Sequence, residues 1–287
     1  MREPSRFRIS ISPLDLDQTL GCGQTFRWRS MADGSWKGIV DRDAFVLRPS
    51  ARHLSVEAYS DDHEAKSRLL KYLRASDDLK TIHARLSEDE VIARGISRVD
   101  GLRLVRIPSW ECIVSYVIAT NSNVKRISRM VDGVATRFGD IVHEELHSFP
   151  SWKQLREASV EELVGCGLGY RAKHIHALCR TIDDGVIDRM GALPYEELRR
   201  ELRQLPGIGD KVADCVSLFG FGHLEAFPID VWIERALKRL YGATGSYAKL
   251  RGFAARRFGE YAGYAQEYLY HNERRLYKDG RCAFSQV

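Results

Sequence analysis

The chain has 287 residues, of which 44% are hydrophobic and 29% are charged, a composition typical of a globular protein with a substantial core. No apolar run approaches the length of a membrane span, and the N-terminal MREPSRFRIS lacks the apolar stretch of a signal peptide. We therefore expect a monomer without membrane contact that stays where it is made, in the cytoplasm or nucleoid of a prokaryote or the nucleus of a eukaryote.

The positions of the charged residues and of the cysteines indicate which ligands the protein binds. The net charge is +5, and residues 230–281 hold eleven Lys and Arg against six Asp and Glu, a local excess equal to that of the whole chain. A basic region of this kind suits DNA phosphates, although a solvated surface also explains it. The cysteines form no CxxC pair and no metal-binding cluster, which predicts free thiols, no metal and no iron–sulfur cluster. They are Cys22, Cys112, Cys166, Cys179, Cys215 and Cys282.

Residues 7–59 read as β structure. Short runs with strand character, TFRWR, SWKGIV, AFVLRP and HLSVEAY, are separated by the turn signals ADGS and DRD. They predict a twisted antiparallel sheet of four or five strands. A glycine-rich segment, Leu20-Gly21-Cys22-Gly23-Gln24, leads into the sheet. Its two glycines allow the backbone to approach either a neighbouring strand or a ligand closely.

From Asp61 onward the pattern is helical, and Pro108, Pro150, Pro194 and Pro206 fall between helices. The fold class is therefore α+β, with an N-terminal antiparallel β lobe of residues 1–62 packed on a mostly helical body of residues 63–287. After a first helix in DDHEAKSRLLKYLRAS, helices are expected near 77–87, 88–99, 109–121, 123–138, 151–165, 170–184, 194–204, 211–220, 230–241, 246–259 and 261–277.

The stretch LPGIGDKVADC, residues 205–215, organises the body. Pro206 ends one helix, and Gly207 and Gly209 permit a tight turn into the next helix. The amides of the two glycines, together with the positive end of the second helix, can approach an anion such as a backbone phosphate. The sequence thus predicts a helical hairpin that contacts DNA.

Lys211 lies in the first turn of that second helix, where the macrodipole disfavours a cation. This position leaves some neutral amine to act as a nucleophile. Cys215 shares its face four residues later, and Asp230 precedes the helical run VWIERALKRL, where a helix N-terminus would keep it ionised. An amine and a fixed carboxylate can displace a leaving group at an acetal-like carbon. A solvated lysine and an ordinary N-cap remain the alternatives.

Polar or aromatic residues at three other helix positions could have either a structural role or a role in binding DNA. Asn121-Ser122-Asn123 could simply cap the helix VKRISRMV that follows. The run GLGYR places Tyr170 and Arg171 at a helix start, where they could stack on a base or contact a phosphate. Gln266 and Tyr270 share a face of the last helix, either as part of a base pocket or as an amphipathic pair.

LPGIGDKVADC followed by FPIDVW resembles the helix-hairpin-helix, Gly/Pro-Asp superfamily of DNA base-excision glycosylases. With GQTFRW, TNSNVKRI and YAGYAQEYLY, the resemblance extends over nearly the whole chain to the 8-oxoguanine DNA glycosylases of the eukaryotic-like type. It implies a bifunctional N-glycosylase and abasic-site lyase that flips 8-oxoguanine out of duplex DNA, preferably opposite cytosine, excises it through a Schiff base and β-eliminates the 3′ phosphate. It also implies two helical lobes that flank the active-site cleft.

The resemblance implies a role for each matching residue. Lys211 would be the nucleophile, Asp230 the essential carboxylate, and Gly23 would read N7–H of the base through its carbonyl. Cys215 and Tyr270 would cover the two faces of the flipped base and Gln266 its Watson–Crick edge, with Asn121 in the vacated gap and Arg126, Tyr170 and Arg171 around the estranged cytosine. The chain departs from the family at Ser122, which replaces an Asn, at Tyr270, which replaces a Phe, and at Trp232, a DNA-contacting position where well-known members have a His.

Three other functions agree less well with the sequence. The first is a related glycosylase that removes another oxidised base, but Gly23, Gln266 and Tyr270 together favour a purine as the substrate. A non-catalytic DNA-binding module would not need both Lys211 and Asp230, and an enzyme acting on free nucleotides would not need the opposite-strand set. No cofactor is expected, and the sequence leaves open whether hairpin carbonyls bind a monovalent cation.

Overall fold

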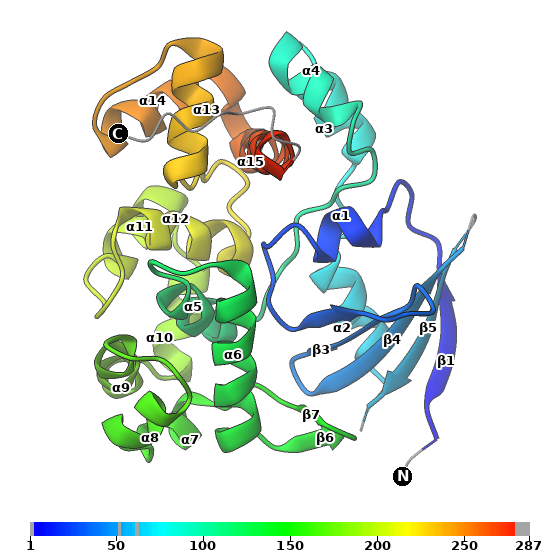
Figure 1. Ribbon diagram of the computed structural model, residues 1–287, viewed down its shortest axis with the longest axis vertical. Coiled ribbons are helices and arrows are strands. Elements are labelled where there is room, and N and C mark those ends of the chain that lie inside the picture. The colour runs from blue at the N-terminus through cyan, green and yellow to red at the C-terminus, as the bar shows by residue number, and fades with distance from the viewer. Residues whose placement is uncertain (1–2, 51–52, 61–62, 279–287) are drawn as a thin grey trace.

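An antiparallel sheet of five strands forms one side of the molecule in a computed structural model that describes residues 3–50, 53–60 and 63–278 (Figure 1). The strand order is β1-β5-β4-β3-β2, so the four consecutive strands β2 to β5 form a meander, and β1 pairs with β5 to become one edge of the sheet. The predicted sheet is confirmed. Its strands are β1 (Ser5–Ile9), β2 (Trp28–Ser30), β3 (Trp36–Val40), β4 (Asp43–Pro49) and β5 (Leu54–Tyr59).

Two features of the sequence explain the sheet: side chains that alternate between buried and partly exposed positions, and a glycine where two strands pack closely. In β5 every second side chain is buried, beginning at Leu54, which is the pattern of a strand with one face on a core. Gly38 in β3 pairs with Trp28 in β2, and a Cβ at Gly38 would lie 2.4 Å from the indole. The indole nitrogen of Trp28 donates to the hydroxyl of Tyr72, 3.0 Å away, which ties the sheet to α2 (Ala65–Tyr72).

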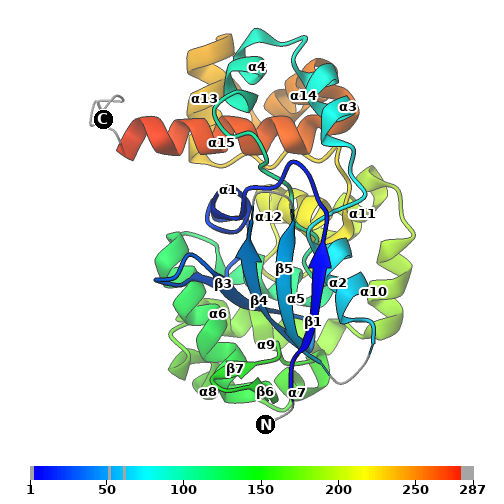
Figure 2. The same ribbon diagram turned by 90° about the vertical axis from the view of Figure 1, so that its right-hand side faces the viewer.

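The helices form two lobes beside the sheet, and α15 crosses the molecule above α1 (Figures 1 and 2). The upper lobe in these views contains α3 (Leu79–Leu86), α4 (Glu90–Ile96), α13 (Val231–Tyr241), α14 (Tyr247–Phe258) and α15 (Ala262–Lys278). The lower lobe contains α5 (Ser109–Ile118), α6 (Val124–Phe138), α7 (Trp152–Arg156), α8 (Val160–Gly165), α9 (Arg171–Thr181), α10 (Asp184–Gly191), α11 (Tyr195–Leu202) and α12 (Asp210–Cys215).

One hydrophobic cluster runs through all three parts, from Phe45 in the sheet through Val212 in α12 to Tyr264 in α15. The sheet is therefore packed on the helical body as predicted, whereas a domain boundary at residue 62 stays a prediction. Within the described residues, no helix combines the length and apolar character that a membrane crossing requires. The five cysteines in the described residues are unpaired thiols; Cys282 lies outside them, as does Arg281 in the basic region.

Several short elements differ from the sequence expectation. The range 151–165 is two helices rather than one, because Ser159 begins a new capping box with Glu162. The range 211–220 ends as a π-helical turn at Val216–Phe221. Three elements were not predicted at all: α1 (Leu16–Leu20), α10, and the hairpin of β6 (Ile141–His143) with β7 (Leu146–His147). Pro108 and Pro194 directly precede α5 and α11, as the sequence predicted.

Candidate active site

The turn between α11 and α12 is as tight as its glycines predict. Gly207 has a φ of +79°, and a Cβ there would lie 2.9 Å from His174 and 3.2 Å from Val117. Gly209 is the exposed N-cap of α12, and no side chain caps the helix amides there. The amides at the start of α12 are consequently available to an anion, and binding of a phosphate stays a prediction.

Lys211 lies in the first turn of α12, where the sequence placed it. Its Nζ is 5.2 Å from the centroid of the Tyr116 ring, within the range of a cation–π contact. The Tyr116 ring stacks on Phe219, with centroids 5.6 Å apart and planes 5° apart, and its hydroxyl donates to the Gln24 carbonyl, 3.0 Å away. The amine is therefore held against a rigid aromatic wall that also contacts the N-terminal lobe.

Cys215 is buried one turn further along the same helix face. Burial raises the pKa of its thiol to about 12, against the opposing effect of the nearby Lys211 amine. The side chain is therefore a neutral thiol at physiological pH and offers a small polarizable surface rather than a nucleophile.

Asp230 is the N-cap of α13, and one carboxylate oxygen accepts from the backbone N–H groups of Trp232 and Ile233, both 2.9 Å away. The capping interpretation is thus confirmed. The carboxylate also lines the same cavity as Lys211, so capping fixes its position at that cavity.

That cavity contains six of the predicted site residues. They come from the loop after α1, from α12, from the start of α13 and from α15: Gly23, Lys211, Cys215, Asp230, Gln266 and Tyr270. Five further residues complete the lining and were not predicted: Gln24, Tyr116, Phe219, Pro228 and Glu267. Its volume of about 50 Å³ is far below the ~300 Å³ of a small ligand pocket, so entry of a base requires the lining to move apart.

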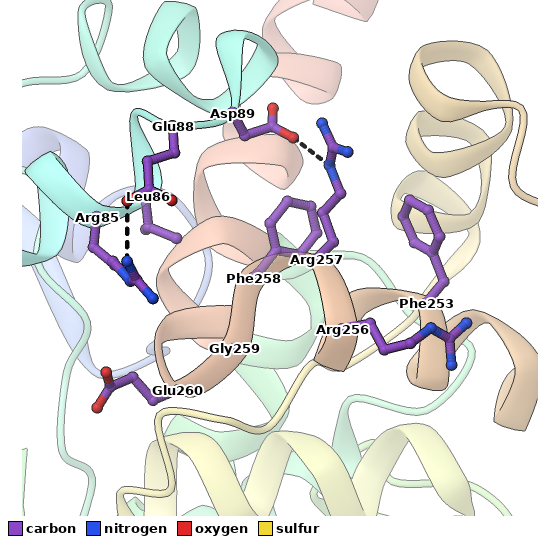
Figure 3. A pocket seen from close by; sticks show the side chains of 10 residues that line it. All are labelled: Arg85, Leu86, Glu88, Asp89, Phe253, Arg256, Arg257, Phe258, Gly259 and Glu260. Carbon is purple, nitrogen blue, oxygen red and sulfur yellow. Dashed lines mark hydrogen bonds and ion pairs between the residues drawn. The ribbon is translucent and has the colours of Figure 1, made fainter.

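A larger hollow of about 590 Å³ lies elsewhere, between α3 and the C-terminal end of α14 (Figure 3). Its charged side chains are largely paired with one another, Arg257 with Asp89 at 2.6 Å and Arg85 with Glu88 at 3.0 Å. Among the described residues, its lining contains no lysine amine, whereas the smaller cavity combines the amine of Lys211 with the carboxylate of Asp230 and aromatic rings. We assign the active site to the smaller cavity because chemistry requires converging reactive groups, not volume.

Gly23 and Gln266, which the sequence predicts to read the base, both lie where a ligand can contact them. Gly23 has a φ of +109°, and a Cβ there would lie 3.0 Å from both Val124 and Arg274. The guanidinium of Arg274 donates to the carbonyl of Cys22 and so holds this strand entry. Gln266 is only 6% exposed, and its side-chain oxygen has no hydrogen-bond partner within the described residues. A buried unpaired amide oxygen of this kind is a site that a bound base can satisfy.

Gln24 fixes the loop that carries Gly23. Its side chain donates to the carbonyls of Thr19 and Arg103, each 2.7 Å away, and accepts from the N–H of Val105 at 3.0 Å. Its position in GQTFRW was the only sign of its importance in the sequence, because two of its three partners, Arg103 and Val105, are about 80 residues away.

Three of the four residues predicted to face the opposite strand lie together near the junction before α6. Asn121 has a φ of +49°, and its side chain donates to the hydroxyl of Tyr170, 3.1 Å away. Arg171 is 3% exposed and donates to the carbonyls of Thr120, at 3.0 Å, and of Asn121, at 3.2 Å. Arg126 is exposed on α6. The structure thus brings three of the four together, with Arg171 holding the Asn121 loop and Arg126 directed to solvent.

Two family models cover most of the chain. Residues 6–113 match the 8-oxoguanine DNA glycosylase N-terminal domain, and residues 114–257 match the HhH-GPD superfamily base excision DNA repair proteins. The chain is 32% identical to the N-glycosylase/DNA lyase OGG1 of Arabidopsis thaliana, over 97% of this chain and 82% of that protein. This protein belongs to the 8-oxoguanine DNA glycosylase family of the HhH-GPD superfamily. The predicted family, fold class and N-glycosylase/lyase class are confirmed.

Two more relatives of this glycosylase agree. The probable N-glycosylase/DNA lyase of Methanothermobacter thermautotrophicus is 30% identical, over 93% of this chain and 96% of that protein. The 8-oxoguanine glycosylase/lyase of Clostridium acetobutylicum, in complex with DNA containing cytosine opposite 8-oxoguanine, superposes with a TM-score of 0.89 at 25% identity, covering 96% and 97% of the two chains.

A buried network behind the hairpin of this glycosylase was not predicted. Asp214 is fully buried and accepts from Tyr195 at 2.8 Å, from Nε of Arg199 at 2.7 Å and from Tyr247 at 2.5 Å. The hydroxyl of Tyr247 also accepts from the N–H of Ile229, 3.2 Å away. The network therefore links α12, which carries Lys211, to the residue before Asp230.

Two other expectations concern DNA and metal. Trp232 is half-buried beside Asp230, with its ring edge-to-face against Tyr277 at 5.2 Å and below the guanidinium of Arg235 at 5.7 Å. Across the described residues, no three His, Cys, Asp or Glu side chains lie close enough together to bind a metal ion.

Proposed function

We propose that this glycosylase excises 8-oxoguanine from duplex DNA by covalent catalysis through Lys211 and then cleaves the strand at the abasic site. The observation that carries the proposal is the single cavity that Lys211 and Asp230 share with Gly23, Gln266 and Tyr270. An amine, a carboxylate and an unpaired amide oxygen converge there, and the similar protein from Clostridium acetobutylicum is named as an 8-oxoguanine glycosylase/lyase.

The damaged nucleotide must leave the stack before it reaches this cavity, which costs a few kcal/mol. Asp230 then stabilises positive charge that develops on the sugar and helps Lys211 lose a proton. Lys211 attacks C1′ while the C1′–N bond breaks and its electron pair leaves with the base. The C1′–O4′ bond then breaks as the nitrogen lone pair forms the C=N bond, and O4′ takes a proton to become a hydroxyl. The resulting Schiff base permits loss of a C2′ proton and β-elimination, in which the C3′–O bond breaks and the 3′ phosphate leaves.

Discrimination against guanine depends on N7, which carries a hydrogen only in the oxidised base. A Gly23 carbonyl that faces N7 would pair with that N–H, whereas normal guanine would leave two acceptors opposed, a penalty of about 1–3 kcal/mol. The buried oxygen of Gln266 would accept from the Watson–Crick edge, and Tyr270 and Cys215 would cover the base faces. Entry into the small cavity supplies further selectivity.

Contact with the DNA backbone would use the amides of Gly207 and Gly209, the Trp232 region and the basic C-terminal part of the chain. On the opposite strand, Asn121 would fill the vacated gap while Tyr170 and Arg126 approach the cytosine and Arg171 holds their loop. Hairpin carbonyls could also bind a monovalent cation, which the sequence leaves open.

The test is excision of 8-oxoguanine from a defined duplex, with borohydride trapping of the covalent adduct. Lys211→Ala should abolish both readouts and leave duplex binding intact, because the residue lies at the cavity rather than in the core. Asp230→Asn keeps the cap but removes the charge, so excision should fall by orders of magnitude. An adduct on Lys211→Ala would refute the nucleophile assignment, and preferential excision of another oxidised base would refute the substrate.

A further inference from the structure

Glu267 is a buried carboxyl inside the active-site cavity that the reaction described above does not use. It follows Gln266 on α15 and lines the same cavity as Lys211 and Asp230. Its side chain is 2% exposed, and its oxygen Oε1 has no hydrogen-bond partner in the described part of the chain. A buried carboxyl oxygen without a partner is costly, which indicates that something else in the cavity satisfies it.

The surroundings favour the protonated form of this carboxyl. Burial raises the pKa of Glu267 to about 7, and the negative charge of Asp230 adds to the rise. A hydrogen bond with the Cys22 thiol and the charge of Arg274 act in the other direction. The other titratable groups around it are the cavity amine of Lys211 and four groups whose raised pKa values keep them neutral: Cys215, Tyr116, Tyr268 and Tyr270.

Glu267 differs in this respect from the other carboxyl of the cavity. One oxygen of Asp230 accepts from two backbone N–H groups, an arrangement that suits a carboxylate. The buried oxygen Oε1 of Glu267, by contrast, has no hydrogen-bond partner in the described part of the chain, so it is available to carry a proton. Two carboxyls with opposite environments in one site are suited to opposite roles, one charged and one acidic.

We propose that Glu267 is a catalytic residue, the general acid that protonates the base as it leaves. The proposal rests on the proposed function, because it needs a base in this cavity. As the Lys211 amine forms its bond to C1′, the C1′–N bond breaks and its electron pair leaves with the base. The Glu267 proton passes to the departing base, which leaves neutral, and the carboxylate then takes a proton from the secondary ammonium formed at Lys211. A proton donor whose acidity matches the operating pH contributes about 10²–10⁴-fold.

The test compares base excision with strand cleavage at a preformed abasic site. Single-turnover excision of 8-oxoguanine opposite cytosine is measured between about pH 5.5 and 9, in the parent and in Glu267→Gln, which keeps the acceptor for Cys22 but carries no acidic proton. Glu273→Gln is the matched control, because Glu273 is buried on the same helix and is absent from the cavity lining. β-Elimination at the abasic site is measured with the same three proteins.

We expect Glu267→Gln to slow excision about 100-fold at pH 6 and to act on the abasic site as fast as the parent, since no base leaves there. The parent's excision should decline as pH rises above about 7, whereas lyase activity should not. Glu273→Gln should keep both activities.

Equal losses of excision and lyase in Glu267→Gln, or excision equal to that of the parent, would overturn the assignment. If Glu267→Gln fails to fold, the parent protein alone decides: an excision rate that does not decline above neutral pH would overturn the assignment. Parent protein that cleaves abasic sites but leaves 8-oxoguanine in place refutes the proposed substrate, and the role of Glu267 with it.

Discussion

Replacing Asp214 with Asn should destabilise the protein severely although Asp214 does not line the cavity. The carboxylate is fully buried and accepts from Arg199, Tyr195 and Tyr247. An Asn side chain has one acceptor oxygen, and its amide would face donors while the buried Arg199 loses the buried one of its two carboxylate partners. Breaking a buried ion pair in this way costs about 3–5 kcal/mol.

Asp210→Asn is the matched control, because Asp210 also pairs with Arg199, at 2.5 Å, but its side chain is 38% exposed. Solvent screening limits such a pair to about 1 kcal/mol or less. Urea denaturation of both variants, followed by circular dichroism with the slope m held in common, measures the difference. A loss below about 1 kcal/mol for Asp214→Asn, or equal losses in both, would refute the assignment of the ion pair's strength to burial.

The same variant should also slow excision in the protein that remains folded. Tyr247 joins Asp214 to the backbone of Ile229, so loss of the carboxylate loosens the loop before Asp230 relative to α12. If each folded molecule excises the base at the parent's rate, the hydrogen bonds of Asp214 contribute to stability alone and not to catalysis.

Two further predictions concern backbone geometry and pH. Gly207→Ala should lose about 1–3 kcal/mol in thermal or urea unfolding, because of its φ of +79° and the 2.9 Å approach to His174, whereas Gly209→Ala, with open space around it, should lose about 0.5 kcal/mol. The folded protein holds a proton on Glu267 up to about pH 7, so this group's stabilisation, up to about 3 kcal/mol, is complete below about pH 4.5 and lost as pH rises through 7. Glu267→Gln should flatten that part of the unfolding free energy measured against pH.

Much of the fold was predictable because its signals are local. Alternating burial in β5, beginning at Leu54, and prolines before helices such as Pro194 can be read along the chain. The elements that were missed are short: five residues in α1 and eight in α10, too few to show a clear period. The division of 151–165 depended on a cap at Ser159 inside an otherwise helical pattern.

The site divides in the same way. Lys211 and Asp230 could be found because each lies at a helix start with a recognisable motif around it. Glu267 and Asp214 could not, because their importance comes from burial and from partners on distant elements, and an acidic residue in a helix is usually exposed. Arg171 was predicted to approach the cytosine, but the structure gives its guanidinium to backbone carbonyls, an arrangement that no spacing along the chain reveals.

That arrangement separates the two arginines on the opposite-strand side. Arg126 is exposed and could offer donors to the acceptor atoms of cytosine, whereas adenine presents an amino donor at the corresponding edge. We expect faster excision opposite cytosine than opposite adenine, by tenfold or more if the difference is about 1.4 kcal/mol. Single-turnover excision from duplexes that differ only in the opposing base measures it, and equal rates opposite all four bases would remove this role from the loop.

The two arginine variants should then lose this preference for different reasons. Arg126→Ala removes a contact to DNA and should lower the ratio of rates with little change in melting temperature. Arg171→Ala leaves the carbonyls of Thr120 and Asn121 without their donor, so it should lose about 1–3 kcal/mol of stability and the preference together, because Asn121 at a φ of +49° then lacks its support. An Arg171→Ala protein that melts like the parent but no longer distinguishes cytosine would show instead that the guanidinium leaves its carbonyls to read the base directly.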